Sequence, residues 1–370
     1  IMAQERDYFD ARCSEFAYRN LKKLYGLLGA EQNVQLHIGP DEHGYSQPNR
    51  EAMYGFFNKQ TKVAEGHTEP QLVIEKDQTL WVTPNGQVSE VPSRSVLDFT
   101  RNSAESLAKT RAGFDGEKLH NAIKEVLRLP QERDAVSYRI LRGNSGRKYP
   151  LPNFTNYAVQ TEPGVEAIMT RLSAKPHVSR PTRGLPECTL YVSHHSADAE
   201  LRSDAWVAEA VKAAGEQPFY AVDVRGIGDS CPDTCGGAQT FLTPYGNDYF
   251  YAAHGVMLDR PYPGQRTLDL LQVLDWLKSL GHERVHLIAS GWGTIPATFA
   301  AVLSPLVTQV MLRHALMSYH AVATADRYTW PLSSFVPGVL KHFDLPDCYA
   351  AMAAKKLQQI EPWGPDGTAA

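Results

Sequence analysis

The feature that constrains the fold most is a series of short apolar runs in the second half of the chain. They occupy residues 188–193, 219–224, 285–289 and 307–312, and a further strand is expected at 357–360. Buried strands of a parallel sheet have this composition, because helices cover both of their faces. Helical patterns separate the first four runs, at about 203–214, 265–280 and 294–303. This alternation predicts an α/β fold with a doubly wound, mostly parallel sheet within residues 185–362.

The beginning of the chain shows a shorter version of the same pattern. Residues 1–9 read as a strand that ends in an acid, Asp7, and an aromatic pair follows. A helix is expected over residues 11–29, where apolar side chains recur at helical spacing. An alternating run, a loop that contains His43 and a second helix come next, at residues 33–38, 39–44 and 49–58.

The following segment, residues 62–130, lacks this alternation. Short alternating runs at 79–83 and 87–91 flank Asn85-Gly86, and such a dipeptide between two runs predicts a hairpin. Residues 95–128 are amphipathic and favour helices. The sequence therefore predicts three parts: an α/β piece over 1–61, a connector over 62–130, and a larger α/β domain over 131–370.

Composition excludes some classes of partner. The chain has 370 residues, 43% hydrophobic and 21% charged, with a formal net charge of −4. That charge gives no electrostatic reason to expect nucleic acid or an anionic membrane as a partner. No apolar run reaches the roughly 20 residues that a membrane span needs. Because residue 1 is Ile1, an export signal ahead of it stays open, and with it a secreted or periplasmic location. The oligomeric state cannot be read from the sequence.

The turn after the run at 285–289 reads Ala289-Ser290-Gly291-Trp292-Gly293, and a helical pattern follows it. A Gly-x-Ser-x-Gly turn between strand and helix presents the nucleophile of an α/β-hydrolase. Aligned on that motif, Gly291 stands at the nucleophile position and has no atom that can attack a carbonyl. Ser290 lies one position early, so its side chain is expected to point away from the site.

Residues 1–58 resemble the carbohydrate-esterase branch of the α/β-hydrolases, the acetyl xylan esterase type. The resemblance rests on an acid after a strand, a helix like the one at 17–25, a Gly-Pro-x-x-His loop and a helix like the one at 50–57. It implies that Asp7 orients His43 and that His43 serves as general base and then as general acid. Asp7 and His43 are then expected within hydrogen-bond reach. Other readings stay open: Asp10 could replace Asp7, Asp41 or Glu42 could pair with His43, or Asp7 could cap a helix and His43 be a surface residue.

The second half resembles the same fold at Val222-Asp-Val-Arg-Gly-Ile-Gly-Asp-Ser230, a stretch that shapes the site wall in the family. Arg225 and Asp229 are candidate substrate-binding residues there, with a structural salt bridge as the alternative. Asp366, in the loop after the last strand, corresponds to Asp7, but no histidine follows it. His194 and His195 are expected to be loop histidines, since no motif supports a metal site.

These observations predict a segment of a tandem α/β-hydrolase: the end of one hydrolase domain followed by a degenerate second one. The full-length protein would be a carboxylic ester hydrolase that acts on polysaccharide acyl or methyl esters, with its serine upstream of Ile1 and no cofactor. The alternative is a non-catalytic pseudo-hydrolase that serves as a carbohydrate-binding or scaffold domain. A circular permutant is a further interpretation. Duplication explains the sequence better, because an acid loop after a strand occurs at both ends of the chain.

Overall fold

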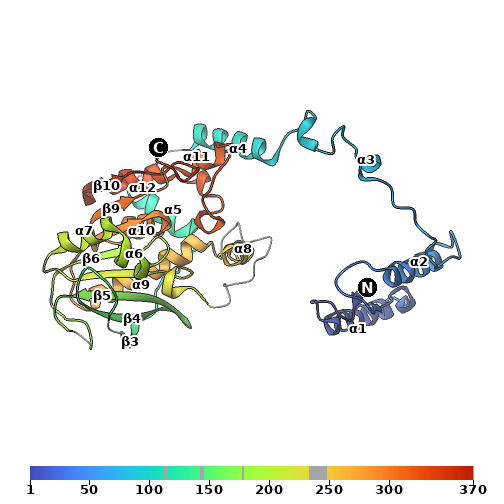
Figure 1. The fold of residues 1–370 in the computed structure, drawn as a ribbon, viewed down its shortest axis with the longest axis horizontal. Coiled ribbons are helices and arrows are strands. Elements are labelled where there is room, and N and C mark those ends of the chain that lie inside the picture. Colours follow the sequence, from blue (N-terminus) through green and yellow to red (C-terminus); the bar gives the residue numbers. More distant parts are fainter. Residues whose placement is uncertain (112, 114–115, 142–145, 177–178, 233–247, 370) are drawn as a thin grey trace. The chain divides into compact units, whose positions relative to one another are not determined.

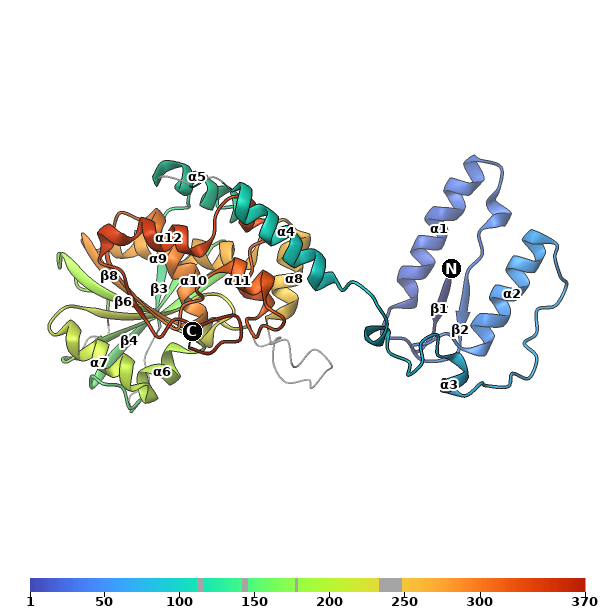
Figure 2. The same ribbon diagram turned by 90° about the horizontal axis from the view of Figure 1, so that it is seen from above.

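The chain divides into two compact units, unit 1 (Ile1–Ser93) and unit 2 (Arg94–Ala370), which are described separately (Figures 1 and 2). The computed structural model describes residues 1–111, 113, 116–141, 146–176, 179–232 and 248–369. Within these ranges, no helix is both long and apolar enough to cross a membrane.

Unit 1 contains two short parallel strands and two long helices. The elements are β1 (Met2–Gln4), α1 (Ala11–Leu27), β2 (His37–Gly39), α2 (Gln47–Thr61) and α3 (Asp77–Leu80). Strand β1 pairs in parallel with β2, so the helix between them makes the crossover. The order strand, helix, strand, loop with His43, helix is therefore present as expected.

Unit 1 buries very little of its apolar surface. Helix α1 has no buried residue, and Leu27 is 85% exposed. Other large side chains that stay exposed include Tyr8, Phe9, Phe16, Leu24, Leu28 and Phe57. Among the described residues, β1 pairs with β2 alone, which leaves its other edge without a partner strand. Two strands with so little burial are marginal by themselves.

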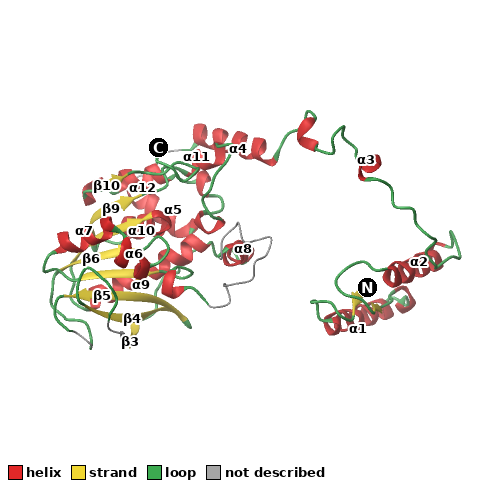
Figure 3. Ribbon diagram, in the orientation of Figure 1, coloured by secondary structure: helices red, strands yellow, loops and turns green. Residues whose placement is uncertain are grey.

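Unit 2 is built on one sheet of the order β10-β9-β8-β6-β7-β5-β4-β3 (Figure 3). Its strands are β3 (Ser137–Leu141), β4 (Asn153–Glu162), β5 (Val165–Ser173), β6 (Glu187–Val192), β7 (Phe219–Asp223), β8 (Arg284–Ser290), β9 (Val307–Arg313) and β10 (Gln358–Ile360). Its helices are α4 (Val96–Thr110), α5 (Gly116–Val126), α6 (Ala197–Ser203), α7 (Ala205–Ala214), α8 (Tyr249–Met257), α9 (Tyr262–Ser279), α10 (Thr294–Leu303), α11 (Tyr319–Thr324) and α12 (Leu345–Ala351). The five strands from β7 to β10 in this order pair in parallel.

Alternating side chains of the central strands feed two separate cores. On β6, Leu190 and Val192 pack in the larger core with helices α5, α9 and α10, whereas Tyr191 lies in the smaller core with α6 and α7. Strand β7 divides in the same way, with Val222 in the larger core and Ala221 in the smaller one. Successive residues of a strand point to opposite faces, so helices cover both faces of the sheet, and the predicted doubly wound sheet is confirmed.

Two expectations about the elements are wrong. The predicted hairpin around Asn85-Gly86 is absent: helix α3 and a 3₁₀ turn at Val88–Glu90 occupy that segment. The first three strands of unit 2 were not predicted. They form an antiparallel meander, in which β5 pairs with β4 on one side and β7 on the other. Apolar and polar residues do not alternate cleanly along these strands, because helix α9 covers part of the meander.

The second half of the predicted connector belongs structurally to unit 2. Leu119 and Ile123 of α5 lie in the larger core, with at most 1% exposure. Arg101 of α4 donates to the carbonyl of Thr324 and to the carboxylate of Asp326. The boundary between the two units, at Ser93 and Arg94, therefore lies inside the segment 62–130 that was predicted as a connector.

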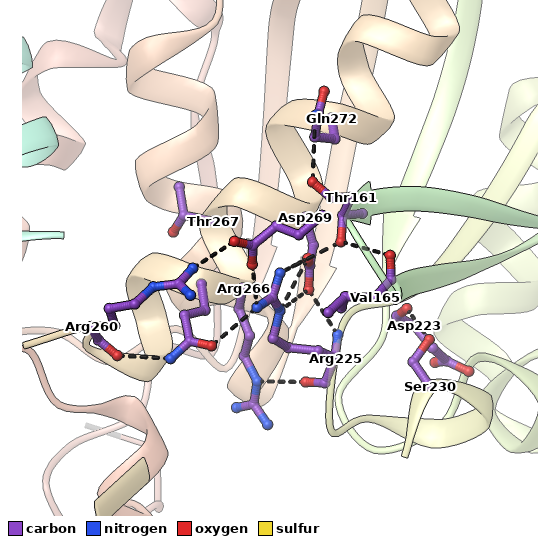
Figure 4. A network of polar contacts seen from close by, with 12 residues as sticks. Thr161, Val165, Asp223, Arg225, Ser230, Arg260, Arg266, Thr267, Asp269 and Gln272 are labelled. Atoms are coloured by element: carbon purple, nitrogen blue, oxygen red, sulfur yellow. Dashed lines mark hydrogen bonds and ion pairs between the residues drawn. The ribbon is translucent and has the colours of Figure 1, made fainter. Parts of the chain in front are cut away.

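A buried ion network holds the turn after β7 against helix α9 (Figure 4). The Arg225 guanidinium donates to both carboxylate oxygens of Asp269, with Nε to Oδ2 at 2.9 Å and Nη2 to Oδ1 at 2.5 Å. The backbone N–H of Arg225 also donates to Asp269 Oδ2, at 3.0 Å. Glu162 accepts from Arg225 Nη1 at 2.7 Å, and Arg266 Nε donates to the Arg225 carbonyl. These paired charges raise the pKa of Arg225 despite its burial.

Breaking this network on one side should destabilise unit 2 strongly. Arg225→Met leaves the fully buried Asp269 carboxylate without its cation, so we expect a loss of about 3–5 kcal/mol in the free energy of unfolding. Arg139→Met, which removes the exposed pair with Glu166, should cost about 1 kcal/mol or less. Urea unfolding followed by circular dichroism measures both. Adding Asp269→Asn to Arg225→Met should recover part of the loss; equal losses for Arg225→Met and Arg139→Met would contradict a buried network.

Candidate functional site

Asp7 and His43 lie in the loops that follow the two parallel strands of unit 1. His43 Nδ1 is 3.1 Å from Asp7 Oδ1 and 3.0 Å from Oδ2. The contact exists because the carboxyl ends of parallel strands meet at the same edge of a sheet. Asp7 also accepts the backbone N–H of Phe9 at 3.0 Å, and this bond is the main cause of its lowered pKa, with His43 contributing. The expected hydrogen-bond reach between Asp7 and His43 is thus present.

The second ring nitrogen of His43 faces an aromatic hydroxyl. Nε2 lies 3.3 Å from the Tyr8 hydroxyl, and the Tyr8 and Phe9 rings pack against the imidazole with centroids 4.5 and 5.7 Å away. A carboxylate only accepts hydrogen bonds, so Nδ1 carries the proton in the neutral ring and Nε2 is the acceptor. An imidazole held in this tautomer can remove a proton from a hydroxyl at Nε2. The same loop lines an open depression of about 420 Å³.

Two buried polar side chains connect β1 to the segments that follow β2. Gln4 Oε1 accepts the N–H of Asp41 at 3.2 Å, while its Nε2 donates to the Gly44 carbonyl and the Ser46 hydroxyl, each at 2.9 Å. Asn49 of α2 donates to the carbonyl of Ala3 at 3.2 Å. Gln4 is 2% exposed. Gln4 is not among the residues expected at the site from the sequence, although a glutamine in an otherwise apolar strand is a usable signal.

The other acids near His43 have different partners. Asp10 accepts from the backbone N–H and the guanidinium of Arg12, so it caps α1. Asp41 faces the guanidinium of Arg6 at 3.9 Å. The structure therefore places Asp7 on His43, and the alternatives with Asp10 and Asp41 are not realised.

In unit 2 the strand-to-helix turn has the shape of a nucleophile turn without a nucleophile. Gly291 follows β8, starts a 3₁₀ turn and has φ of +50°, a conformation that side-chain-bearing residues rarely adopt. Gly293 passes so close to β6 that a Cβ would lie 2.4 Å from the carbonyl oxygen of Ser193. Gly291 thus lies on the turn between strand and helix, as predicted.

The ring of His194 fills the space in front of Gly291. A Cβ on Gly291 would lie 2.3 Å from His194 Nδ1. The same nitrogen accepts the backbone N–H of Trp292 at 3.0 Å. In an α/β-hydrolase, the N–H of the residue after the nucleophile stabilises the oxyanion. Burial and the neighbouring His195 and His314 lower the pKa of His194 to about 3, so the ring is neutral.

The amides after β6 are also occupied. Glu200 accepts the N–H of His194 at 3.0 Å, of His195 at 2.7 Å and of Ser196 at 3.1 Å. The Tyr191 hydroxyl donates to the same carboxylate. In an α/β-hydrolase a loop after another strand supplies the second oxyanion donor. The amides at both positions in this chain therefore already have acceptors. His194 is more than the loop histidine that the sequence suggested, and Glu200 was not singled out.

The remaining second-site candidates do not converge on Gly291. Arg225 belongs to the buried network with Asp269, which matches the salt-bridge alternative. Asp229 is exposed, and its backbone N–H donates to the buried Asp223. Asp366 accepts from the hydroxyl and N–H of Thr368. Ser290 is 5% exposed and ends β8. Among the described residues, no group of three His, Cys, Asp or Glu side chains is arranged to hold a metal.

Comparisons with known proteins show the fold. No family model and no curated protein matches the chain. A candidate acetyl xylan esterase from Bacteroides fragilis NCTC 9343 superposes with a TM-score of 0.55 at 15% identity, over 76% of this chain and 77% of that chain. An acetyl xylan esterase from Paenibacillus sp. R4 has a TM-score of 0.41 at 14% identity, over 71% and 94% of the two chains. The predicted α/β-hydrolase fold is confirmed.

Restoring a serine at position 291 should strain the turn. Gly291→Ser must displace the His194 ring, so we expect a loss of about 1–3 kcal/mol in stability on top of the backbone cost of a left-handed residue. Gly215→Ser controls for that cost, since Gly215 has φ of +61° and open space around its Cβ. Denaturant unfolding should show a larger loss for Gly291→Ser. His194→Ala should relieve it in the double variant; purely additive effects would contradict the contact.

Proposed function

We propose that this chain is part of a carboxylic ester hydrolase that acts on acyl or methyl esters of a polysaccharide, with Asp7 and His43 in unit 1 as its acid and base. The observation that carries the proposal is the contact between Asp7 and His43 Nδ1, at 3.0 and 3.1 Å, from loops that follow two parallel strands. The α/β-hydrolase fold of the chain supports it, because that fold carries its acid and its histidine in such loops.

The geometry suits proton transfer in acyl transfer to water. His43 Nε2 removes the proton of a serine hydroxyl as the oxygen attacks the ester carbonyl, and the imidazolium then protonates the leaving alcohol. In the second half, Nε2 takes a proton from water as the water oxygen attacks the acyl-enzyme carbonyl. The bond from the acyl carbon to the serine oxygen then breaks, the imidazolium returns the proton to that oxygen, and the acid is released. Asp7 keeps the ring in the tautomer with Nδ1–H and stabilises the imidazolium. Tyr8, at 3.3 Å from Nε2, marks where the attacking hydroxyl would lie.

The serine is proposed to come from a segment upstream of Ile1. In α/β-hydrolases the order along the chain is nucleophile, acid, histidine, so the nucleophile for Asp7 and His43 precedes both. The exposed apolar side chains of α1, and the edge of β1 that has no partner strand among the described residues, suit a unit that packs beside further strands. Such a neighbouring sheet would also exclude water from His43.

Unit 2 is proposed to be non-catalytic. Gly291 has no nucleophilic atom, His194 occupies the space in front of it, and the amide of Trp292 has an acceptor. A serine alone at position 291 would lack both space and a free oxyanion donor. This arrangement is also what favours the second candidate function, a pseudo-hydrolase that binds or positions a ligand without chemistry.

The esterase proposal is tested with a longer polypeptide, which contains the residues encoded upstream of Ile1 followed by residues 1–370. It should contain Gly-x-Ser-x-Gly after a strand and hydrolyse 4-nitrophenyl acetate and acetylated xylan. His43→Ala should lower kcat by about 10⁶-fold and Asp7→Asn by about 10⁴-fold, because the base or its orientation is lost.

Matched variants separate catalysis from folding. Asp10→Asn keeps the cap of α1, and His67→Ala removes another exposed histidine of unit 1, so both should retain activity. An upstream sequence without the motif, or full activity in His43→Ala, would overturn the proposal.

The 370-residue chain alone should not hydrolyse 4-nitrophenyl acetate above background. It lacks the serine that His43 would activate, and Gly291 offers none in unit 2. Spectrophotometric assays at pH 7–8 measure this. Turnover by the chain that disappears in Ser290→Ala would show that the nucleophile position in unit 2 has been misidentified.

A further inference from the structure

An apolar groove lies between helix α4 and the segment that follows β9 in unit 2. Its volume is about 480 Å³, which falls within the roughly 300–1,000 Å³ of pockets that hold small ligands. Helix α4 forms one wall, and α11 and the 3₁₀ turn at Val339–Lys341 contribute to the other. Figure 1 shows α4 beside α11, and the two helices are in contact. The groove shares no lining residue with the turn at Gly291, so it is a separate feature of unit 2.

Two arginines hold the walls of the groove in place. Arg101, in the first half of α4, donates from Nε to the carbonyl of Thr324 at 3.1 Å and from Nη2 to the carboxylate of Asp326 at 2.6 Å. Arg111 directly follows α4, and its Nη1 donates to the carbonyl of Leu340 at 3.3 Å. These contacts fix α4 against the opposite wall at both ends of the groove, while the apolar side chains between them leave it open.

The walls offer a nearly continuous apolar surface. Aliphatic and aromatic side chains from both sides line the groove, among them Val96, Leu97, Leu107, Val322, Phe335 and Val339. The Phe335 ring contacts the rings of Tyr319 and Tyr328, with centroids 6.5 and 5.5 Å apart. The Tyr319 hydroxyl donates to the Ser334 carbonyl, so it needs no partner in the groove. An apolar molecule that covers this surface removes it from water, which favours binding.

The charge at the groove is positive. Among the described residues that line it, Lys341 is the only charged one, and it is exposed. The carboxylates of the neighbouring segments have other partners: Asp98 accepts the backbone N–H of Ser95 at 2.7 Å, and Asp326 accepts from Arg101. An ammonium group at the edge of an apolar groove complements a molecule that carries one negative charge at the end of an apolar body.

From these contacts we infer that the groove binds an unbranched aliphatic carboxylate of medium length, with its chain along Leu97 and Val322 and its carboxylate on Lys341. A neutral apolar molecule would leave the ammonium group unused. A molecule with several charges would place some of them against apolar walls, where they lose hydration without gaining a partner. This inference does not depend on the ester chemistry proposed for Asp7 and His43, since every lining residue belongs to unit 2.

The experiment is calorimetric titration of the full 370-residue chain with octanoate, decanoate and decan-1-ol, below the concentrations at which they aggregate. We expect saturable binding of decanoate, with affinity that rises about fourfold for each methylene added from octanoate. Lys341→Met should weaken decanoate binding about fivefold and leave that of decan-1-ol unchanged. Lys212→Met is the matched control, because it removes an 80% exposed lysine side chain of α7 that does not line the groove.

A second variant tests the place of binding. Ala323→Phe puts a ring into the groove from α11 and should lower the affinity for decanoate about tenfold or more; Lys341→Met, at an exposed position, decides the matter if Ala323→Phe loses the circular dichroism spectrum of the parent chain. The inference is overturned by the absence of saturable decanoate binding, by equal affinities for decanoate and decan-1-ol, or by unchanged decanoate binding in Lys341→Met. It is also overturned if sedimentation shows a dimer that Ala323→Phe dissociates and decanoate does not, because a second copy of the chain then occupies the groove.

Discussion

Parallel strand pairing is the constraint on which both sites depend. Strands that run in the same direction deliver their following loops to one edge of the sheet, whatever their separation along the chain. In unit 1 this brings Asp7 against His43. In unit 2 it brings His194 against Gly291 and Trp292. The same geometry thus produces an ordered contact between an aspartate and a histidine in one unit and a filled turn in the other.

The fold of unit 2 could be predicted from sequence largely because its central strands are buried on both faces. Runs such as 219–224 and 285–289 are mostly apolar, with Asp223 and His286 as the exceptions, and few structures other than a parallel sheet require such runs. The antiparallel strands β3 to β5 escaped prediction because their patterns are mixed. At Asn85-Gly86 the local turn signal was sound, but the flanking runs gain no cross-strand partner, so the segment forms a helical turn instead.

Prediction of the sites was uneven for a similar reason. Asp7 and His43 follow strands and carry a family resemblance, so their pairing could be anticipated. The roles of Gln4 and His194 arise from contacts between segments that are distant along the chain. Glu200 accepts the amides of three consecutive residues in the loop that leads into its own helix, α6. Nothing in the spacing of these residues indicates such contacts. Arg225 illustrates the converse, because a motif residue that seemed suited to a substrate is satisfied by Asp269 within the fold.

The filled space at Gly291 has an evolutionary consequence. A chain that acquires a serine there still meets the His194 ring, and a chain that first loses His194 leaves the Trp292 amide without its acceptor. Neither single step yields an active turn, and each carries a cost in stability. A catalytic serine at position 291 therefore requires coupled changes in the loops after two strands, so substitutions at positions 194 and 291 are constrained as a pair and not one at a time.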